Sequence, residues 1–460
     1  DRATAYADAM VARGRDVYGR VHSPLFAAAL NRQTMKIGDR PGIDGVRAND
    51  RCLYGANPQR HKALYELLYR LSKTTGDRRY ADAADAALGW FFKHCQSEQT
   101  GLLAWGEHVF WHFDDEAAGG GKSAHEIKGE WPFWDACYRL APDPSRRFAR
   151  GLWEHQVADH ETGDFSRHTR WDAHGPGHGT EFPRYAGQMI ACWADAYARP
   201  ENADWAHRPT MLRAIKTVMD RMDHNQKVGK TGYLLAGTDD QHRQISWPTS
   251  NLELARCLWK SAPLMPDDLA QRMRAMALRQ DRDFFRMPHT IIEPDGGFAV
   301  TIDVTTGKPR SRAMNRPYTT TWTDGYGYGP HAGAANKCYQ RYEQLKATHT
   351  DLVGQYRTVI LAAARRYLDT GPDRDALLKP SAITAVIRLM LNTHALTGEA
   401  RYLVRAEHFA DLGIGLFLRD GLPLPAATNH HAHYEANTGG PDFMLVLFDL
   451  HQARAARQDQ

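Results

Sequence analysis

The sequence predicts an all-α protein in which six to seven helical hairpins close into an (α/α) toroid or barrel. Three observations favour this fold: amphipathic helical periodicity dominates the chain, one hairpin motif occurs twice, and long polar loops separate the helices. An array of stacked helix pairs leaves apolar faces at its two ends, and closure into a ring buries them. With 460 residues, 42% of them hydrophobic, the chain can supply such a core, so we predict one domain over residues 1–460.

The repeated motif is a helix–turn–helix hairpin. In residues 61–95, apolar side chains recur at helical spacing on both sides of a Thr-Gly-Asp turn at 75–77. A Thr-Gly-Glu turn at 397–399 has the same setting, and each turn precedes an Arg-Tyr pair and a small residue, Ala84 or Ala406. The glycine ends the first helix, the acid begins the second, and the alanine allows close helix contact. Further helical pairs are predicted in 131–157, 186–222 and 250–280, and in 337–370 with 380–396.

Long polar, glycine-rich stretches lie between the predicted helices. Loops of this length in a compact domain are usually functional, and these carry most of the clustered His, Arg, Tyr and Trp. Residues 296–310 alternate between polar and apolar, which predicts a minor β-hairpin that reaches over the cleft. The stretches are 101–125, 163–185, 230–249, 286–332 and 421–440.

The charge and hydropathy patterns exclude two classes of partner. The net charge is only +4 and no long Lys/Arg run is present, so we expect no nucleic-acid partner. No apolar run approaches the length of a membrane-spanning helix, so we expect no membrane partner. A mildly basic chain is compatible with a polyanionic substrate. The oligomeric state stays open.

The cysteines and the start of the chain bear on the cellular location. The six cysteines are widely scattered and lack the spacing of a zinc or redox motif, so we predict buried free thiols rather than disulfides. The sequence starts at Asp1 without a methionine, which fits a cleaved export signal or a chain trimmed in another way. We expect a periplasmic or secreted protein, and a cytoplasmic location stays open.

Three loop stretches carry the candidate chemistry: LLAWGEHVF (102–110), SAHEIKGEWPFW (123–134) and DFSRHTRW (164–171). Each is placed at a loop of a successive hairpin, and loops at one rim of a toroid converge. His108, Glu126 and His168 are therefore predicted to meet. Two imidazoles and one carboxylate suit one divalent transition metal (Mn, Co, Ni or Zn, with Fe(II) also compatible) better than calcium. The alternative is that these histidines only form hydrogen bonds.

Here the chain resembles a known family. The order W-G-x-H, then H-E-x-K, then R-H after a G-D-F turn is similar to that of the family 2 polysaccharide lyases, which are pectate lyases with an α/α barrel. The resemblance covers roughly residues 55–200. It implies that His108, Glu126 and His168 hold the metal, and that Arg167, directly before the second histidine, is the Brønsted base. Because an arginine's pKa stays above about 12, Arg167 as a carboxylate clamp remains the alternative.

Other polar and aromatic side chains are predicted to line an anionic sugar track, with a structural role in loop packing as the alternative for each. Tyr434 or Tyr318 is the candidate proton donor to the leaving oxygen, and Tyr434 is our choice. The substrate-binding candidates are Trp105, Lys128, Arg170, Trp171, His174, His178, Arg184, Arg316, Tyr318, Trp322 and His433.

The residue types and the resemblance together predict a polysaccharide lyase that cleaves an acidic poly- or oligosaccharide, with pectate or oligogalacturonide favoured. β-Elimination on a uronate removes the C5 proton beside a carboxylate, which a metal and cationic side chains neutralise. One alternative is a glycoside hydrolase on the same scaffold, which needs two flanking carboxylic acids. Another is a non-catalytic glycan-binding protein. The hydrolase candidates are Asp114, Asp115, Glu130, Glu181 and Asp324.

Overall fold

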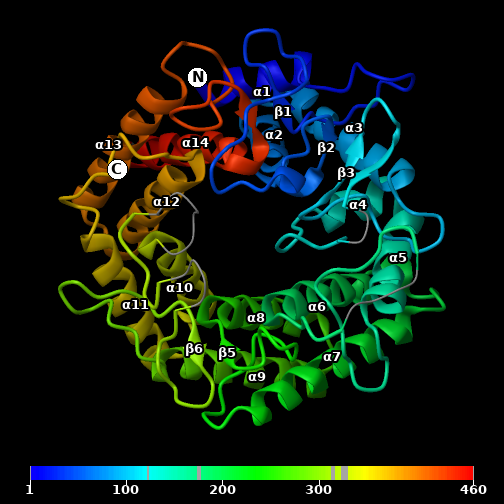
Figure 1. Ribbon diagram of the computed structural model, residues 1–460, viewed down its shortest axis with the longest axis vertical. Helices are drawn as coiled ribbons and strands as arrows, with labels where there is room; N and C mark the ends of the chain where they lie inside the picture. Colours follow the sequence, from blue (N-terminus) through cyan, green and yellow to red (C-terminus); the bar gives the residue numbers. More distant parts are fainter. Residues whose placement is uncertain (1, 122–123, 174–177, 312–315, 323–329, 459–460) are drawn as a thin grey trace.

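The computed structural model describes residues 2–121, 124–173, 178–311, 316–322 and 330–458. Its helices form a closed ring, in which the first and last helices lie side by side (Figure 1). Successive inner neighbours around the ring are α2, α14, α12, α10, α8 and α6. Between α2 and α6 the ring continues through α3, α4 and α5. The predicted all-α toroid is confirmed.

Consecutive helices pair as hairpins, and α14 packs against α1 to close the ring. Within the described residues this makes six sequential hairpins and one closing pair, which agrees with the prediction of six to seven. The helices are α1 (Arg2–Arg13), α2 (Lys62–Thr75), α3 (Arg78–His94), α4 (Trp134–Leu140), α5 (Pro142–Gly151), α6 (Pro183–Ala198), α7 (Arg208–Val228), α8 (Pro248–Ser261), α9 (Asp267–Arg286), α10 (His331–Leu345), α11 (Thr350–Arg365), α12 (Pro380–Thr397), α13 (Ala400–Phe417) and α14 (Gly440–Gln458). Short helical turns are η1 (Ala48–Asp50), η2 (Pro58–Arg60), η3 (Leu152–Gln156), η4 (Pro200–Asn202), η5 (Ala262–Leu264) and η6 (Ala436–Thr438).

The two Thr-Gly-acid turns end and begin helices as predicted. Gly76 and Gly398 adopt φ values of 77° and 72°, the left-handed conformation that a side chain would strain, and they end α2 and α12. Asp77 accepts a hydrogen bond from the backbone N–H of Arg79 at 3.0 Å and so caps α3. Glu399 makes no such bond, because its longer side chain pairs with Arg401 instead.

The strands are short and only partly follow the prediction. The turn from Asp303 to Lys308 closes a small hairpin bridge between Ile302 and Pro309, within the predicted 296–310. The main partner of β6 (Ile302–Asp303), however, is the distant β5 (Ile245–Ser246). A three-stranded sheet of β2 (Gly55–Ala56), β3 (Val109–His112) and β4 (Ala117–Gly120), and a pair of β1 (Ala29–Leu30) with β7 (Tyr434–Glu435), had not been predicted.

One large apolar core runs through the ring, and a small satellite core lies around β6. All six cysteines are buried and free, as predicted. Helix α1, which no motif had predicted, contributes Tyr6 and Met10 to the large core. In the described part of the chain, no helix combines the length and the apolar character that crossing a bilayer requires.

Candidate active site

The backbone of His125 aligns the three predicted loops. His125 forms antiparallel bridges with Gly106 on one side and with Thr169 on the other. Its N–H donates to the carbonyl of Thr169 at 2.8 Å, and the Thr169 N–H donates back at 3.3 Å. The three segments therefore lie side by side, where the ring passes from α2 towards α6. This pairing, and not the hairpin repeat alone, explains why the loops converge.

The bridge register brings Glu126 and His168 together. In an antiparallel pair, the residue after His125 lies opposite the residue before Thr169, so the two side chains share one face. His168 Nε2 is 3.1 Å from Glu126 Oε2. Gly106 makes the close approach possible, because a Cβ at this position would lie 2.7 Å from the backbone oxygen of Glu126.

Glu107 lies at the centre of the site, although it had not been predicted as a functional residue. Its Oε2 is 3.5 Å from His108 Nε2, 3.7 Å from His168 Nε2 and 3.1 Å from Arg167 Nη1. Its Oε1 pairs with the ammonium of Lys128. Two imidazoles and two cations therefore surround one carboxylate. The signal for it was its place between the Gly and His of the W-G-x-H motif.

Asp50 holds the far side of His108. Its Oδ1 lies 2.6 Å from His108 Nδ1, so the Nε2 of the ring faces Glu107 and His168. The two imidazole rings are 5.4 Å apart between centroids. A carboxylate behind the second nitrogen of a metal-binding histidine commonly sets its orientation. Asp50 precedes His108 by more than fifty residues, and no local motif pointed to it.

The charges of the site favour a bound cation. Burial opposes ionisation of Glu107, but its contact with His168 and the charges of Lys128 and Arg167 hold its pKa well below the usual range. Burial also opposes ionisation of Glu126, and contact with His168, followed by the same two cations, lowers its pKa. Burial disfavours protonated His168, yet the two glutamates raise its pKa. Anionic carboxylates that stabilise a proton on His168 would stabilise a metal ion there too.

The donor atoms fit a transition metal. One ligand atom each from Glu107, His108 and His168 lies within 4.8 Å of the other two, a mixed N/O set within the described residues. Within the described part of the chain, the buried Glu107 Oε2 has no hydrogen bond of good geometry, despite the nearby cations. The predicted ligand Glu126 is 2% exposed and adjoins the group through His168. The structure thus offers two glutamates, Glu107 and Glu126, for one carboxylate position.

Arg167 and Arg184 form a cationic wall beside these donors. Both guanidinium groups lie over the ring of Phe182, at 5.2 and 5.0 Å from its centroid. Arg167 Nη1 also contacts Glu126 Oε2 at 3.4 Å. Arg167 thus contacts both glutamates, a geometry that suits the clamp role, and its role in the reaction stays a prediction. Lys128, paired with Glu107, and Arg184, over Phe182, lie beside these donors, and their role in substrate binding stays a prediction.

Three predicted site residues are buried elsewhere, and these predictions are wrong. Tyr434 is fully buried, and its hydroxyl is hydrogen-bonded to that of Tyr6 at 2.9 Å, so it cannot reach a leaving group. Trp105 is fully buried among core aromatic rings, where it anchors the loop that carries His108. His433 is buried against Glu435 at 2.9 Å.

Two further aromatic candidates, Tyr318 and Trp322, pack against apolar side chains in the contacts that the structure describes. Tyr318 is half-buried against the satellite core and bridges to Ala299. Trp322 packs on Tyr367 and Phe409 at centroid distances of 5.3 and 5.5 Å. These contacts lie in apolar layers and not at the histidine loops. The alternative role in loop packing therefore describes both residues better.

The remaining candidates lie near the surface. Arg170 is half-exposed and pairs with Asp172, and Arg316 is exposed. His178 pairs with Asp164 at 2.7 Å, and Trp171 is half-buried against the core. These four stay predictions, and His174 lies outside the described residues.

The carboxylates proposed for a hydrolase do not face one another as a pair. Glu130 forms ion pairs with Arg256 and Lys260, and the fully buried Glu181 pairs with Arg221 at 2.5 Å. Asp114 and Asp115 are exposed in the turn between β3 and β4. Asp324 lies outside the described residues. Two flanking acids of the kind that glycoside hydrolysis requires are not found among the described candidates.

Fold and site together define an α/α-toroid protein with a mixed histidine–glutamate centre flanked by arginine and lysine. Residues 23–189 match the protein family described as periplasmic pectate lyase, and every residue of the centre lies within this stretch. A pectate disaccharide-lyase of Dickeya dadantii (strain 3937) is 30% identical over 105 residues. That alignment covers 22% of this chain and 19% of the relative's length. The resemblance predicted from the motifs is confirmed for this part of the chain.

Solved structures of similar shape include sugar-converting enzymes. Cellobiose 2-epimerase from Bacillus thermoamylovorans B4167 is 7% identical, with 97% of this chain and 98% of that chain covered and a TM-score of 0.49. D-mannose isomerase is 8% identical, with 98% and 96% covered and a TM-score of 0.48. Likenesses this remote carry no information about the chemistry of this chain.

Proposed function

We propose that this protein is a polysaccharide lyase that cleaves a uronate-containing polysaccharide, pectate or oligogalacturonide in the first place, by metal-assisted β-elimination. The observation that carries the proposal is the convergence of His108, His168 and Arg167 on Glu107 Oε2. These residues lie in the stretch that matches the periplasmic pectate lyase family. The substrate in the name of the Dickeya relative supports pectate.

His108, His168 and one of the two glutamates would hold the metal, with Asp50 fixing the ring of His108. A divalent transition metal bound there would supply a Lewis acid that neutralises the substrate carboxylate. Asp50 Oδ1 contacts His108 Nδ1, so the Nε2 of that ring faces Glu107, and Glu126 Oε2 contacts His168 Nε2 itself, which makes it a further oxygen donor at the same position. The protein's part is to present these donors in a fixed arrangement.

Arg167 and Lys128 provide the positive charge that the reaction needs. Loss of the C5 proton leaves negative charge on the carbon next to the carboxylate, and fixed cations stabilise that charge. The electron pair then forms the C4–C5 double bond, the C4–O bond breaks, and the leaving oxygen takes up a proton. Where Arg167 clamps the carboxylate, a solvent hydroxide or water takes the C5 proton; in the second assignment the neutral guanidine of Arg167 takes it, and in both the leaving oxygen takes its proton from solvent.

The test is a panel of uronic-acid polysaccharides, incubated with and without chelator and followed by ultraviolet absorbance. Elimination creates an unsaturated product that absorbs, whereas hydrolysis does not. We expect absorbance to rise on polygalacturonate and to stop after chelation. Chain cleavage without absorbance would establish the hydrolase instead, and tight binding without cleavage would establish the glycan-binding protein.

We further propose a periplasmic or secreted location. The support is the description of the matched family as periplasmic and the acidic polysaccharide that the site would take. Cell fractionation of the native host with an antibody against this chain tests it. Recovery in the cytoplasmic fraction would contradict the proposal.

A further inference from the structure

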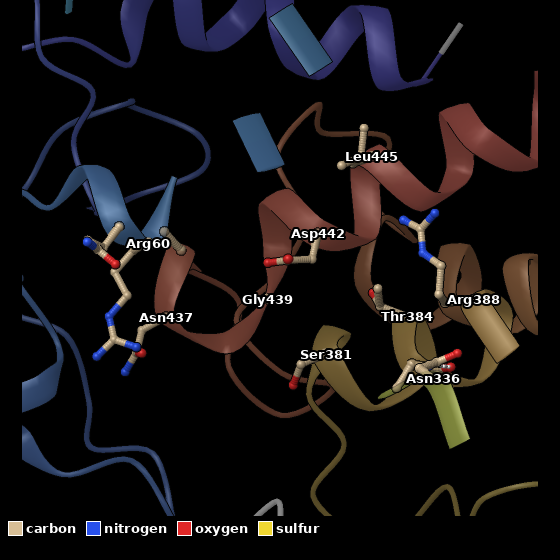
Figure 2. Close-up of a pocket in the computed structure, with 12 residues that line it drawn as sticks. Arg60, Asn336, Ser381, Thr384, Arg388, Asn437, Gly439, Asp442 and Leu445 are labelled. Carbon is tan, nitrogen blue, oxygen red and sulfur yellow. Dashed lines mark hydrogen bonds between the residues drawn. The ribbon is translucent and has the colours of Figure 1, made fainter. Parts of the chain in front are cut away.

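A separate pocket opens on the inner side of the ring, between η2 and the first turns of α12 and α14. Its volume is about 400 Å³, which lies in the range typical of small-ligand sites. Figure 2 shows Arg60 and Asn437 at one end, Arg388, Thr384 and Asn336 at the other, and Asp442 and Ser381 between them. Polar side chains make up most of its lining. We call it the α12–α14 pocket.

Among the described residues, no hydrogen-bond partner is found for three buried polar atoms of the lining: Gln59 Nε2, Arg60 Nε and Thr384 Oγ1. Gln59 is only 4% exposed, and its Oε1 already accepts the backbone N–H of Lys128 at 2.8 Å. An unsatisfied buried donor costs free energy that a ligand with acceptor oxygens would recover. The amide and the guanidinium can only donate through these nitrogens, so the ligand they suit is rich in oxygen.

The pocket adjoins the candidate active site through η2. Gln59 receives the Lys128 N–H, and Arg60 Nη2 donates to the backbone carbonyl of Glu107 at 3.2 Å. Lys128 and Glu107 are the two residues that form the ion pair at the centre of the site. The turn η2 therefore forms part of the wall of the α12–α14 pocket and also contacts the backbone of two residues of the candidate active site.

The charges of the lining select the kind of saccharide unit. In the described residues Arg60 forms no ion pair, whereas Arg388 at the other end is paired with Asp449. The first turns of α12 and α14 meet here, because a Cβ on Gly439 would lie 2.7 Å from that of Ser381. The guanidinium of Arg60 favours an anionic group at its end of the pocket, whereas Asp442 in the first turn of α14 already offsets the positive N-terminal end of that helix. The carboxyl of Asp442 suits hydroxyl groups as donors.

We propose that the α12–α14 pocket binds a uronate unit of the chain adjacent to the unit that reacts. Its carboxylate faces Arg60, and its hydroxyl groups face Gln59, Thr384 and Asp442. This inference rests on the proposed function, since the uronate substrate supplies the ligand's chemistry. Because α12 and α14 bound the pocket, it gives the enzyme a defined subsite on one side of the reaction centre.

Binding of methyl α-D-galacturonide by isothermal titration tests the proposal, because this ligand has no second sugar to be eliminated. Thr384→Val removes the unpaired hydroxyl at constant shape and should weaken binding about three- to ten-fold. Thr358→Val is the matched control, because Thr358 is an exposed threonine of the outer helix α11.

The neutral methyl α-D-galactoside should bind at least about ten-fold more weakly to the wild type. Arg60→Lys should reduce that preference, because lysine lacks the Nε–H and the planar fork.

The outcomes separate the pocket from the lyase function. Equal affinity of wild type and Thr384→Val for the uronide, or no preference for it over the galactoside, overturns the pocket even if ultraviolet-absorbing products form. Uronide binding that depends on Thr384 and Arg60 supports the pocket even if no such products form, and then the lyase function fails alone. Thermal unfolding of both threonine variants should match that of the wild type.

Discussion

Two segments with similar composition have opposite roles in this protein. The loops that carry Glu107, His108 and His168, and the segment 433–435, are both rich in histidine, acid and aromatic residues. In the loops, the side chains of Glu107, His108, Arg167 and His168 converge and remain 14% to 26% exposed. In 433–435, strand pairing of β7 with β1 draws Tyr434 and Glu435 fully into the core.

The difference shows that clustered imidazoles and carboxylates mark a site only where their charges stay accessible. Glu435 forms an ion pair with the buried Arg51, and the hydroxyl of Tyr434 is hydrogen-bonded to that of Tyr6. Glu107 instead lies among four nitrogen groups, those of His108, Lys128, Arg167 and His168, and its side chain stays 15% exposed. The segment 433–435 should therefore control folding, and the loops that carry Glu107, His108 and His168 should control metal binding and turnover.

The largest expected effect is loss of the metal. His108→Ala and His168→Ala each remove one of the two imidazoles that face Glu107, so metal analysis of the purified variants should find no stoichiometric ion. His178→Ala is the control, since His178 is exposed and pairs with Asp164. Full occupancy in both site variants would remove these histidines from the metal centre.

A large effect on stability is expected in the core segment. Glu435→Gln leaves the buried Arg51 without its counter-charge, and removal of one partner of a buried ion pair costs about 3–5 kcal/mol in the free energy of unfolding. Chemical denaturation measures it. Glu407→Gln, whose partner Arg454 is exposed, should cost no more than about 1 kcal/mol. A Glu435→Gln variant as stable as the wild type would contradict the structural role of 433–435.

Variants of Arg167 should lose turnover while they keep the metal, which distinguishes a role in the reaction from a role in metal binding. Arg167→Ala should lower turnover about a hundred- to a thousand-fold with the metal retained, because a preorganised cation is lost. Arg167→Lys keeps the charge but not the planar fork, and its turnover should also fall. Arg150→Ala, on the outer helix α5, controls for loss of a surface arginine. Wild-type turnover in Arg167→Ala would exclude this residue from the reaction.

The two glutamates can be distinguished by metal affinity. Glu126→Gln should lower the metal affinity most, because Glu126 is the predicted ligand. Glu107→Gln should lower the metal affinity about 10- to 100-fold, because Glu107 then only positions the ligands. Competition titration with a chromogenic chelator measures both. If Glu126→Gln keeps its affinity while Glu107→Gln loses the metal, Glu107 is the ligand.

The smallest effect is expected at Tyr434. Tyr434→Phe removes one buried hydrogen bond and should lower the free energy of unfolding by about 1 kcal/mol, with turnover unchanged. Tyr6→Phe should have the same cost, and the double variant should cost less than the sum. A ten-fold loss of turnover in Tyr434→Phe but not in Tyr6→Phe would show that the Tyr434 hydroxyl takes part in the reaction.

Local patterns in the sequence determined the ring and the three motif loops. Helical periodicity and the Thr-Gly-acid turns depend on neighbours three or four residues apart, so Gly76 and Gly398 could be placed as helix ends without a structure. Arg167 and His168 are consecutive in the sequence, so this pair could also be recognised without a structure, and it lies in the candidate active site.

Tertiary structure alone decided which side chains complete the site and which enter the core. Asp50 reaches His108, and Gln59 reaches Lys128, through contacts between segments far apart in the chain. The pairing of β7 with β1, at opposite ends of the chain, buries Tyr434, and no local pattern encodes it. Burial and charge pairing depend on what the whole ring places around a residue, whereas periodicity depends only on the residues beside it.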